Sequence, residues 1–174
     1  DGGGALIVTS AARARDLAKR PVLLRGCGEA VRHQELGAPD LLTIAAKQSG
    51  EQAFGMAGVT RADVDLCAIY DSFTITVLAT LENRGFCKPG EGVDFVSNGR
   101  IGLGGELPVN PDGGGLSSNH PGMRGIFLVI EAVKQLRGEC GERQVADARV
   151  ALAHGTGGTL GVAHSGATLI LARD

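Results

Sequence analysis

The chain holds one tyrosine, and that residue stands where a predicted strand gives way to a predicted helix. A phenol hydroxyl in the segment Ile69-Tyr70-Asp71-Ser72-Phe73 could donate a hydrogen bond to an oxyanion or act as an acid. The plainer alternative is a tyrosine packed in the core. Asp71 and Ser72 also have an alternative role, because either residue could cap the helix that follows.

A histidine lies at the start of the most clearly amphipathic helix that the sequence predicts. His120 follows the triple glycine at 113–115 and precedes Pro121, which suits the first turn of a helix. The positive end of a helix dipole lowers the pKa of a histidine and favours its neutral form. A neutral imidazole can accept a proton from a nucleophile or donate an N–H to an oxyanion, so we predict an acid–base role for His120.

A second histidine ends a predicted buried strand and is followed by glycines. Gly155, Gly157 and Gly158 could expose backbone N–H groups beside His154 and form an anion-binding nest. The alternative is a tight turn with a structural histidine. The run is not a dinucleotide-binding fingerprint, because Leu160 occupies the third glycine position and a strand rather than a helix is predicted to follow.

No nucleophile accompanies these groups. The four cysteines are widely spaced and contain no C-x-x-C pair, which excludes a zinc knuckle and favours a reduced intracellular compartment. No metal site is predicted. Cys27 and Cys67 fall inside predicted strands and are interpreted as buried, inert thiols. The phosphate-binding motif G-x-x-x-x-G-K-[ST] and the nucleophile motif G-x-S-x-G are both absent from the sequence.

Composition narrows the class of protein further. Glycine accounts for 28 of the 174 residues, and half of these glycines fall in 99–125 and 155–166, around the two histidines. With a net charge of −2 and few aromatic side chains, the sequence lacks the basic and aromatic composition typical of nucleic-acid-binding proteins. No apolar run approaches the roughly 18 residues that a membrane-spanning helix needs.

The candidate residues must be positioned by strands and helices that alternate along the chain. This alternation predicts an α/β protein with a largely parallel sheet. Strands are predicted at 5–8, 22–31, 64–69, 150–153 and 167–172, with shorter ones at 95–96 and 107–109. Helices are predicted at 11–19, 41–56, 71–85 and 122–137, with one helical turn at 60–63. The last two strands should pair antiparallel through the glycine-rich segment 155–166.

The chain resembles the C-terminal part of the thiolase superfamily, in the lipid-transfer-protein-like branch related to the sterol-carrier-protein thiolase. Asn119-His120-Pro121-Gly122-Met123-Arg124-Gly125 is similar to the G-H-P loop of that family, with Asn119 in place of a glycine. Tyr70-Asp71-Ser72-Phe73 occupies the place of the N-E-A-F or H-D-C-F motif, and His154-Gly155-Thr156-Gly157-Gly158 that of C-x-G. Gln135-Leu136-Arg137-Gly138-Glu139 and Asp1-Gly2-Gly3-Gly4-Ala5-Leu6 also resemble family segments.

The resemblance implies a βαβαβαββ half with a mixed, mostly parallel sheet covered by helices. Residues 1–20 would be the end of the N-terminal half and 21–174 the C-terminal domain, so the chain would be part of a longer protein and inactive by itself. The substrate would be a coenzyme A thioester, with no covalently bound cofactor, and the protein a homodimer or a heteromer of thiolase chains. Its location would be cytoplasmic, or peroxisomal in a eukaryote. Catalytic roles fall on His120, Tyr70 and His154, and substrate contacts on Asp71, Ser72, Phe73, Asn119, Pro121, Gly155, Gly157 and Gly158.

Two departures from the family motifs leave the reaction open. Tyr70 replaces the asparagine of N-E-A-F, and Ser72 replaces the acid–base cysteine of H-D-C-F. A thiolase-type acyltransferase therefore has only Tyr70 and His154 as candidates for its second acid–base group, and the same Tyr–His pair could supply the acid and the base of a retro-aldol cleavage. The branch also includes proteins similar to retro-aldolases of steroid side-chain acyl-CoA, which act with an OB-fold partner and need no thiol. A non-catalytic acyl-CoA-binding subunit is the third alternative.

Overall fold

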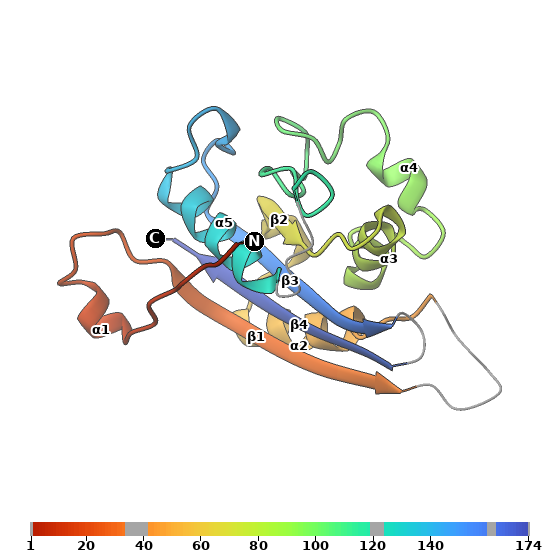
Figure 1. Ribbon diagram of the computed structural model, residues 1–174, viewed down its shortest axis with the longest axis horizontal. Coiled ribbons are helices and arrows are strands. Elements are labelled where there is room, and N and C mark those ends of the chain that lie inside the picture. The colour runs from red at the N-terminus through yellow and green to blue at the C-terminus, as the bar shows by residue number, and fades with distance from the viewer. Residues whose placement is uncertain (1, 34–41, 119–123, 160–162, 174) are drawn as a thin grey trace.

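The fold is a sheet with helices on both faces (Figure 1). The computed structural model describes residues 2–33, 42–118, 124–159 and 163–173. Helices α2 (Ala46–Ala57) and α3 (Thr74–Arg84) cover one face, and α5 (Gly125–Arg137) covers the other. Each face has its own apolar core, so the expected α/β architecture is confirmed.

The sheet is mixed, as expected, but parallel pairing is the smaller share among the described strands. Its order is β1-β4-β3-β2, where the strands are β1 (Leu23–His33), β4 (Ala163–Ala172), β3 (Val150–Thr159) and β2 (Leu66–Ile69). Only β2 and β3 run parallel, and β4 is antiparallel to both β3 and β1. The antiparallel pairing of β3 with β4 is the expected one. The prediction of a largely parallel sheet is wrong because β1 also pairs antiparallel, with β4.

Glycines end the three long helices where the sequence predicts them to end. Gly58, Gly85 and Gly138 each adopt the left-handed conformation directly after α2, α3 and α5. The predicted capping box is also present before the short helix η1 (Arg61–Asp63), where the backbone N–H of Thr60 donates to the Asp63 carboxylate at 2.7 Å. Local signals therefore located these helix ends without tertiary information.

Several expected elements differ in the structure. The predicted strand at 5–8 is irregular backbone, and the helix expected at 11–19 is the single turn α1 (Ala11–Ala14). The pair 95–96 belongs to a short helix, α4 (Gly92–Val96), and only Val109 of 107–109 forms a bridge, to Cys67. The strand at 150–153 continues to residue 159, and another short helix, η2 (Gly141–Arg143), follows α5.

The segment predicted as strand 5–8 has no neighbouring strand in the described structure. Ile7 is 92% exposed and Val8 90% exposed, so this apolar run has no sheet to join. The residues before it lie along α5 (Figure 1): a Cβ on Gly4 would stand 2.6 Å from the Ile130 side chain. The apolar run is present in the sequence, but a strand also requires a neighbouring strand to pair with, and the described structure has none at this position.

Helix α2 lies directly on the backbone of β1 because two glycines of that strand have no side chain. A Cβ on Gly26 would stand 2.1 Å from the carbonyl oxygen of Ala53, and one on Gly28 2.1 Å from that of Ser49. The Gln52 side chain accepts the backbone N–H of Glu29 at 3.0 Å. This contact fixes α2, and with it one layer of the core, against the sheet. None of the described helices has the length and apolar character to cross a membrane.

Candidate active site

Tyr70 and His154 lie beside each other at the carboxyl end of the parallel pairing between β2 and β3. Ile69 pairs with His154, and the backbone N–H of Tyr70 donates to the carbonyl of His154 at 2.8 Å. Their side chains lie on opposite faces of the sheet. Tyr70 packs with Leu128 and Ala153 beneath α5, whereas His154 contacts residues of the α2 and α3 layer. The structure thus brings the two residues together but separates the phenol from the imidazole.

His154 belongs to a buried polar cluster instead of an open loop. Its Nδ1 bonds with the guanidinium of Arg84 and lies 3.1 Å from the Thr168 hydroxyl. Burial, reinforced by the Arg84 charge, holds the pKa of His154 well below its usual value. Burial likewise lowers the pKa of Arg84 to about 9, which leaves it protonated at neutral pH. His154 is therefore a neutral imidazole that accepts from a buried cation.

The glycines after His154 lie within β3, so the predicted loop is wrong for these residues. Gly155, Gly157 and Gly158 pair with β4 across the antiparallel ladder. A Cβ on Gly157 would stand 2.7 Å from the Ser165 hydroxyl, whereas Gly155 faces Gly125 at the start of α5. Their roles in substrate binding remain predictions. The strand continues because β4 supplies a partner for it, which sequence periodicity alone did not reveal.

Asp71 organises a neighbouring loop and does not cap the helix that follows it. Its carboxylate accepts the backbone N–H of Gly115 at 2.7 Å and that of Leu116 at 3.1 Å, and only 4% of the residue is exposed. Gly114 has a φ of +66°, and a Cβ there would stand 2.1 Å from the same carboxylate. Helix α3 begins after Phe73 without a side-chain cap. The hydroxyl of Ser72 instead pairs with that of Thr76 at 3.0 Å.

We expect Asp71→Ala to destabilise the protein by about 1–3 kcal/mol, because two partly buried backbone N–H groups would lose a charged acceptor. Urea unfolding followed by circular dichroism measures this change. Asp94→Ala is the matched control: Asp94 is exposed on α4, and its replacement should change stability by less than about 0.5 kcal/mol. Equal effects of the two substitutions would contradict the organising role of Asp71.

Two further residues shape this region, and sequence reasoning gave neither of them a role. The Asn110 side chain extends the edge of β2, accepting the N–H of Ile69 at 2.7 Å and donating to its carbonyl at 2.9 Å. Arg124 precedes α5, is 7% exposed, and bonds with Asp112 at 2.9 Å and with the Ser118 hydroxyl at 3.1 Å. The signal available in the sequence was an acid in the loop and an arginine just before the helix.

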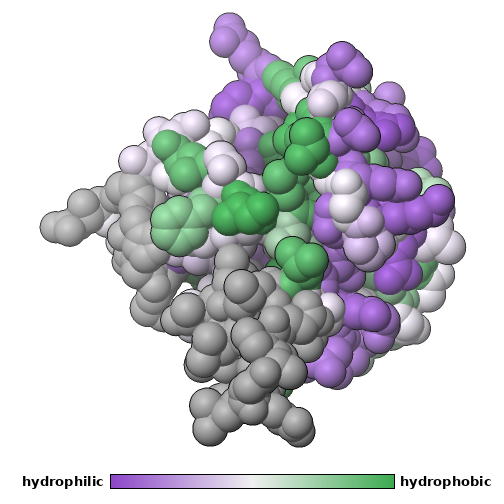
Figure 2. Space-filling view, turned by 90° about the vertical axis from the view of Figure 1, so that its right-hand side faces the viewer, coloured by the Kyte–Doolittle hydropathy of each residue, from purple (hydrophilic) through white to green (hydrophobic). Residues whose placement is uncertain are grey.

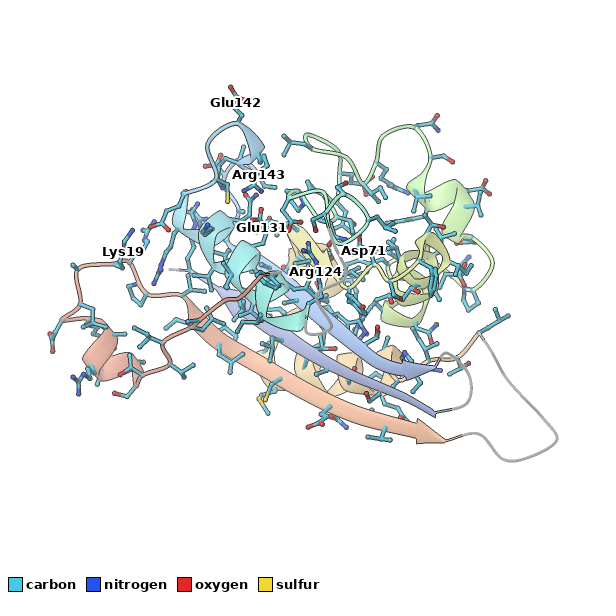
Figure 3. All side chains as sticks on the ribbon, viewed as in Figure 1. Lys19, Asp71, Arg124, Glu131, Glu142 and Arg143 are labelled. Carbon is cyan, nitrogen blue, oxygen red and sulfur yellow. The ribbon has the colours of Figure 1, made fainter. Side chains whose placement is uncertain are left out.

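Asn119, His120 and Pro121 lie outside the described residues, so their predicted roles remain predictions. Ser118 and Arg124 flank this segment and bond to each other. Figure 3 shows Arg124 near Asp71 at one end of α5, while Glu131 lies midway along the helix and Arg143 follows its other end.

The environment of Tyr70 favours the protonated phenol. Burial raises the pKa of Tyr70, the neighbouring Asp71 carboxylate raises it further, and the charge of Arg124 opposes both. Two residues with exposed apolar side chains are near Tyr70 in sequence or structure. Phe73, which is 66% exposed, follows Tyr70 in the chain, and the backbone N–H of Leu116 donates to Asp71. Figure 2 shows apolar side chains gathered between polar ones on the face of the molecule that forms the right-hand side of Figure 1. The arrangement offers a proton donor at the edge of an apolar surface.

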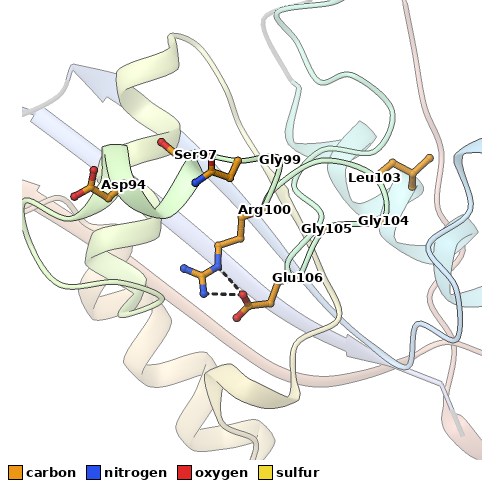
Figure 4. Close-up of a pocket in the computed structure, with 9 residues that line it drawn as sticks. Asp94, Ser97, Gly99, Arg100, Leu103, Gly104, Gly105 and Glu106 are labelled. Carbon is orange, nitrogen blue, oxygen red and sulfur yellow. Dashed lines mark hydrogen bonds and ion pairs between the residues drawn. The ribbon is translucent and has the colours of Figure 1, made fainter.

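A pocket of about 520 Å³ lies apart from Tyr70, on the loop that follows α4 (Figure 4). Its lining includes Arg100 and Glu106, which form an ion pair at 2.6 Å. Within the described part of the chain, no three histidine, cysteine or acidic side chains gather in a way that could hold a metal ion.

The fold and these motifs agree with the comparison against protein families. The family described as "Thiolase C-terminal domain-like" matches residues 28–173, and the chain belongs to this family.

Two kinds of relative share similar degrees of identity with the chain. An "Acetyl-CoA acetyltransferase" from Methanothermobacter thermautotrophicus is 37% identical over 94% of this chain and 43% of its own length. A "17-hydroxy-3-oxo-4-pregnene-20-carboxyl-CoA lyase" from Mycobacterium tuberculosis is 40% identical over 79% of this chain and 37% of its own length. The chain thus spans less than half the length of these relatives.

A solved structure entitled "Ltp2-ChsH2(DUF35) aldolase" is similar over 94% of this chain and 42% of its own, with a TM-score of 0.80 and 34% identity. The thiolase-like fold is therefore confirmed by a relative of known structure. These relatives bear the names of both reactions left open by the sequence, acyl transfer and aldol cleavage.

Proposed function

We propose that the protein containing this chain cleaves a carbon–carbon bond of a hydroxyacyl-CoA thioester in a retro-aldol reaction, with Tyr70 as the proton donor. The observation that carries this proposal is a phenol with a raised pKa at the carboxyl end of β2, beside Asp71 and under the influence of Arg124. The relatives named as a lyase and as an aldolase support the same reaction class.

The reaction balances without a nucleophile on the protein. A base removes the proton of the β-hydroxyl group, the bond between the α and β carbons breaks, and the β carbon becomes a carbonyl. The electron pair of that bond moves onto the thioester carbonyl as an enolate, which is protonated at the α carbon to give a shorter acyl-CoA. Tyr70 can stabilise the enolate oxygen by donating its O–H and can give its proton to the α carbon; the proton that the base took from the hydroxyl group then restores the phenol. We assign the base to His120.

Two buried thiols of this chain are poor candidates for the nucleophile of an acyl transfer. Burial raises the pKa of Cys67 to about 12 and that of Cys140 to about 11, so neither supplies a thiolate at neutral pH. Ser72 stands where the family motif has a cysteine. Thiolase-type acyl transfer remains the second candidate, since the acetyltransferase relative matches 94% of the chain, and it requires a cysteine from outside these residues.

The other site residues take supporting roles in this proposal. His154 is assigned to positioning, because its imidazole is buried on the face of the sheet away from Tyr70. Phe73, which is 66% exposed, is proposed to contact the apolar part of the substrate.

The partners and the domain boundary are part of the same proposal. The solved aldolase names a second component, DUF35, and an OB-fold partner of that kind would complete the enzyme, with coenzyme A carried by the substrate. The boundary between residues 20 and 21, and the assembly of thiolase-like chains into dimers or heteromers, stay predictions.

The full-length protein, with and without its partner, should cleave a tertiary β-hydroxyacyl-CoA in the absence of free coenzyme A. Mass spectrometry of the thioester products measures the reaction. We expect activity to survive treatment with iodoacetamide, because no thiolate takes part. Cleavage of 3-oxoacyl-CoA alone, with consumption of coenzyme A and loss of activity on alkylation, would indicate a thiolase. No cleavage of either substrate would indicate a binding subunit.

A further inference from the structure

Arg124 is a buried cation, and its two hydrogen-bond partners within the described part of the chain come from a single loop. Its guanidinium donates to Asp112 at 2.9 Å and to the Ser118 hydroxyl at 3.1 Å. Asp112 is itself fixed, because it accepts the N–H of Gly114 at 2.9 Å, and Ser118 donates to the Gly114 carbonyl at 3.0 Å. Arg124 therefore ties the start of α5 to the whole turn from 112 to 118.

The same turn carries the residues held by Asp71. A Cβ on Gly115 would stand 3.0 Å from the Asp71 carboxylate and 3.5 Å from Nε of Arg124. The carboxylate and the guanidinium thus both lie close to Gly115, and both side chains are buried. Charges so placed act strongly on a nearby ionisable group, because little water screens them. The ionisable group in question is the phenol of Tyr70, the residue that directly precedes Asp71 in the chain.

The structure assigns to Arg124 the part of a positioning residue: together with Asp71, which directly follows Tyr70 in the chain, it fixes the turn 112–118 at the carboxyl end of β2. This inference rests on the proposed function, since it concerns the same proton donor. We assign Arg124 no contact with substrate, because its two terminal nitrogens donate to Asp112 and Ser118, and its buried Nε, which has no hydrogen-bond partner among the described residues, lies near Gly115. Its loss should therefore affect turnover more than substrate binding.

The direction of the electrostatic effect supports the assignment. Arg124 lowers the pKa of Tyr70, whereas burial and Asp71 raise it. Removing the cation should leave only the two raising influences and make the phenol a weaker acid.

The experiment uses the full-length protein labelled with [¹³Cζ]tyrosine, with the Tyr70 signal assigned by Tyr70→Phe. NMR titration of Arg124→Met, Arg124→Lys and wild type is combined with measurement of kcat and KM. Arg143→Met is the matched control, because Arg143 forms an ion pair with Glu131 near the other end of α5 at 2.6 Å (Figure 3).

We expect Arg124→Met to raise the pKa of Tyr70 and to lower kcat by roughly 10- to 100-fold, with KM changed less than about threefold. Arg124→Lys should keep the pKa of Tyr70 near its wild-type value but lower kcat, because an ammonium group cannot reproduce the forked contact with Asp112 and Ser118. Arg143→Met should lower stability without changing either readout.

An unchanged pKa of Tyr70 in Arg124→Met would overturn the inference, as would wild-type kcat in Arg124→Lys or an equal loss of kcat in Arg143→Met. If Arg124→Met does not fold, kcat of the lysine variant still decides. If the wild type cleaves no acyl-CoA, the proposed function fails, while the titration of Tyr70 separately tests its coupling to Arg124.

Discussion

Tyr70→Phe in the full-length protein should lower kcat by roughly 10²- to 10⁴-fold, because the substitution removes the proton donor and leaves the ring in place. The ring packs against Leu128 and Ala153, so stability should change by no more than about 1 kcal/mol. Turnover of the hydroxyacyl-CoA substrate and urea unfolding together measure the two effects.

Thr80→Val is the matched control for the loss of a hydroxyl group. The Thr80 hydroxyl is buried in α3 and has no hydrogen-bond partner among the described residues, so its removal should leave kcat unchanged and not lower stability. Wild-type turnover in Tyr70→Phe would exclude Tyr70 as the donor.

The pH dependence of kcat offers a second readout of the same residue. The active form is the protonated phenol, and the pKa of Tyr70 lies above its usual value of 10. Activity that depends on this donor should therefore persist on the alkaline side to about pH 10 and fall as the pH rises further. A fall centred near neutral pH would point to a different ionising group.

Gly28→Val should destabilise the protein by about 3 kcal/mol or more, since a side chain would be forced into backbone atoms of α2. A Cβ on Gly28 would stand 2.1 Å from the carbonyl oxygen of Ser49 and 3.0 Å from the backbone nitrogen of Ala53. Backbone atoms in the middle of a helix cannot move aside as a flexible side chain can. Chemical denaturation monitored by far-ultraviolet circular dichroism measures the loss.

Gly55→Ala, in the helix that Gly28 packs against, is expected to have the opposite effect. Gly55 lies in α2, and a Cβ there meets nothing within 4 Å. The substitution should stabilise the protein by about 0.5–1 kcal/mol, because alanine favours a helix more than glycine does. If Gly28→Val were as well tolerated as Gly55→Ala, the close contact between β1 and α2 would not exist in solution.

Local signals were sufficient for the parts of the fold that depend on neighbouring residues in the chain. The ends of α2, α3 and α5 at Gly58, Gly85 and Gly138 follow from left-handed glycines, and the capping box at Thr60 from its spacing. Buried apolar runs identified β2 and the start of β3. The interpretation of Cys67 as a buried thiol is confirmed, since none of it is exposed. The same interpretation is wrong for Cys27, which is partly exposed in β1.

The candidate site was less predictable because its geometry depends on partners distant in sequence. The capping interpretation of Asp71 was reasonable locally, yet its carboxylate bonds to Gly115 and Leu116. The length of β3 depended on β4, and the apolar run at 5–8 found no strand beside it. A strand exists only where another strand satisfies its backbone, which periodicity cannot report.

The sequence by itself determined which chemical groups this chain carries: a single tyrosine, histidines beside glycines, and motifs of the thiolase family without the usual cysteines. Tertiary structure decided which of those groups work together. It directs the side chains of Tyr70 and His154 to opposite faces of the sheet and gathers Asp71 and Arg124 around Gly115. The physical reason is that alternation along paired strands fixes the side of the sheet each residue faces, while the buried charges are positioned by loops that only the folded sheet brings together.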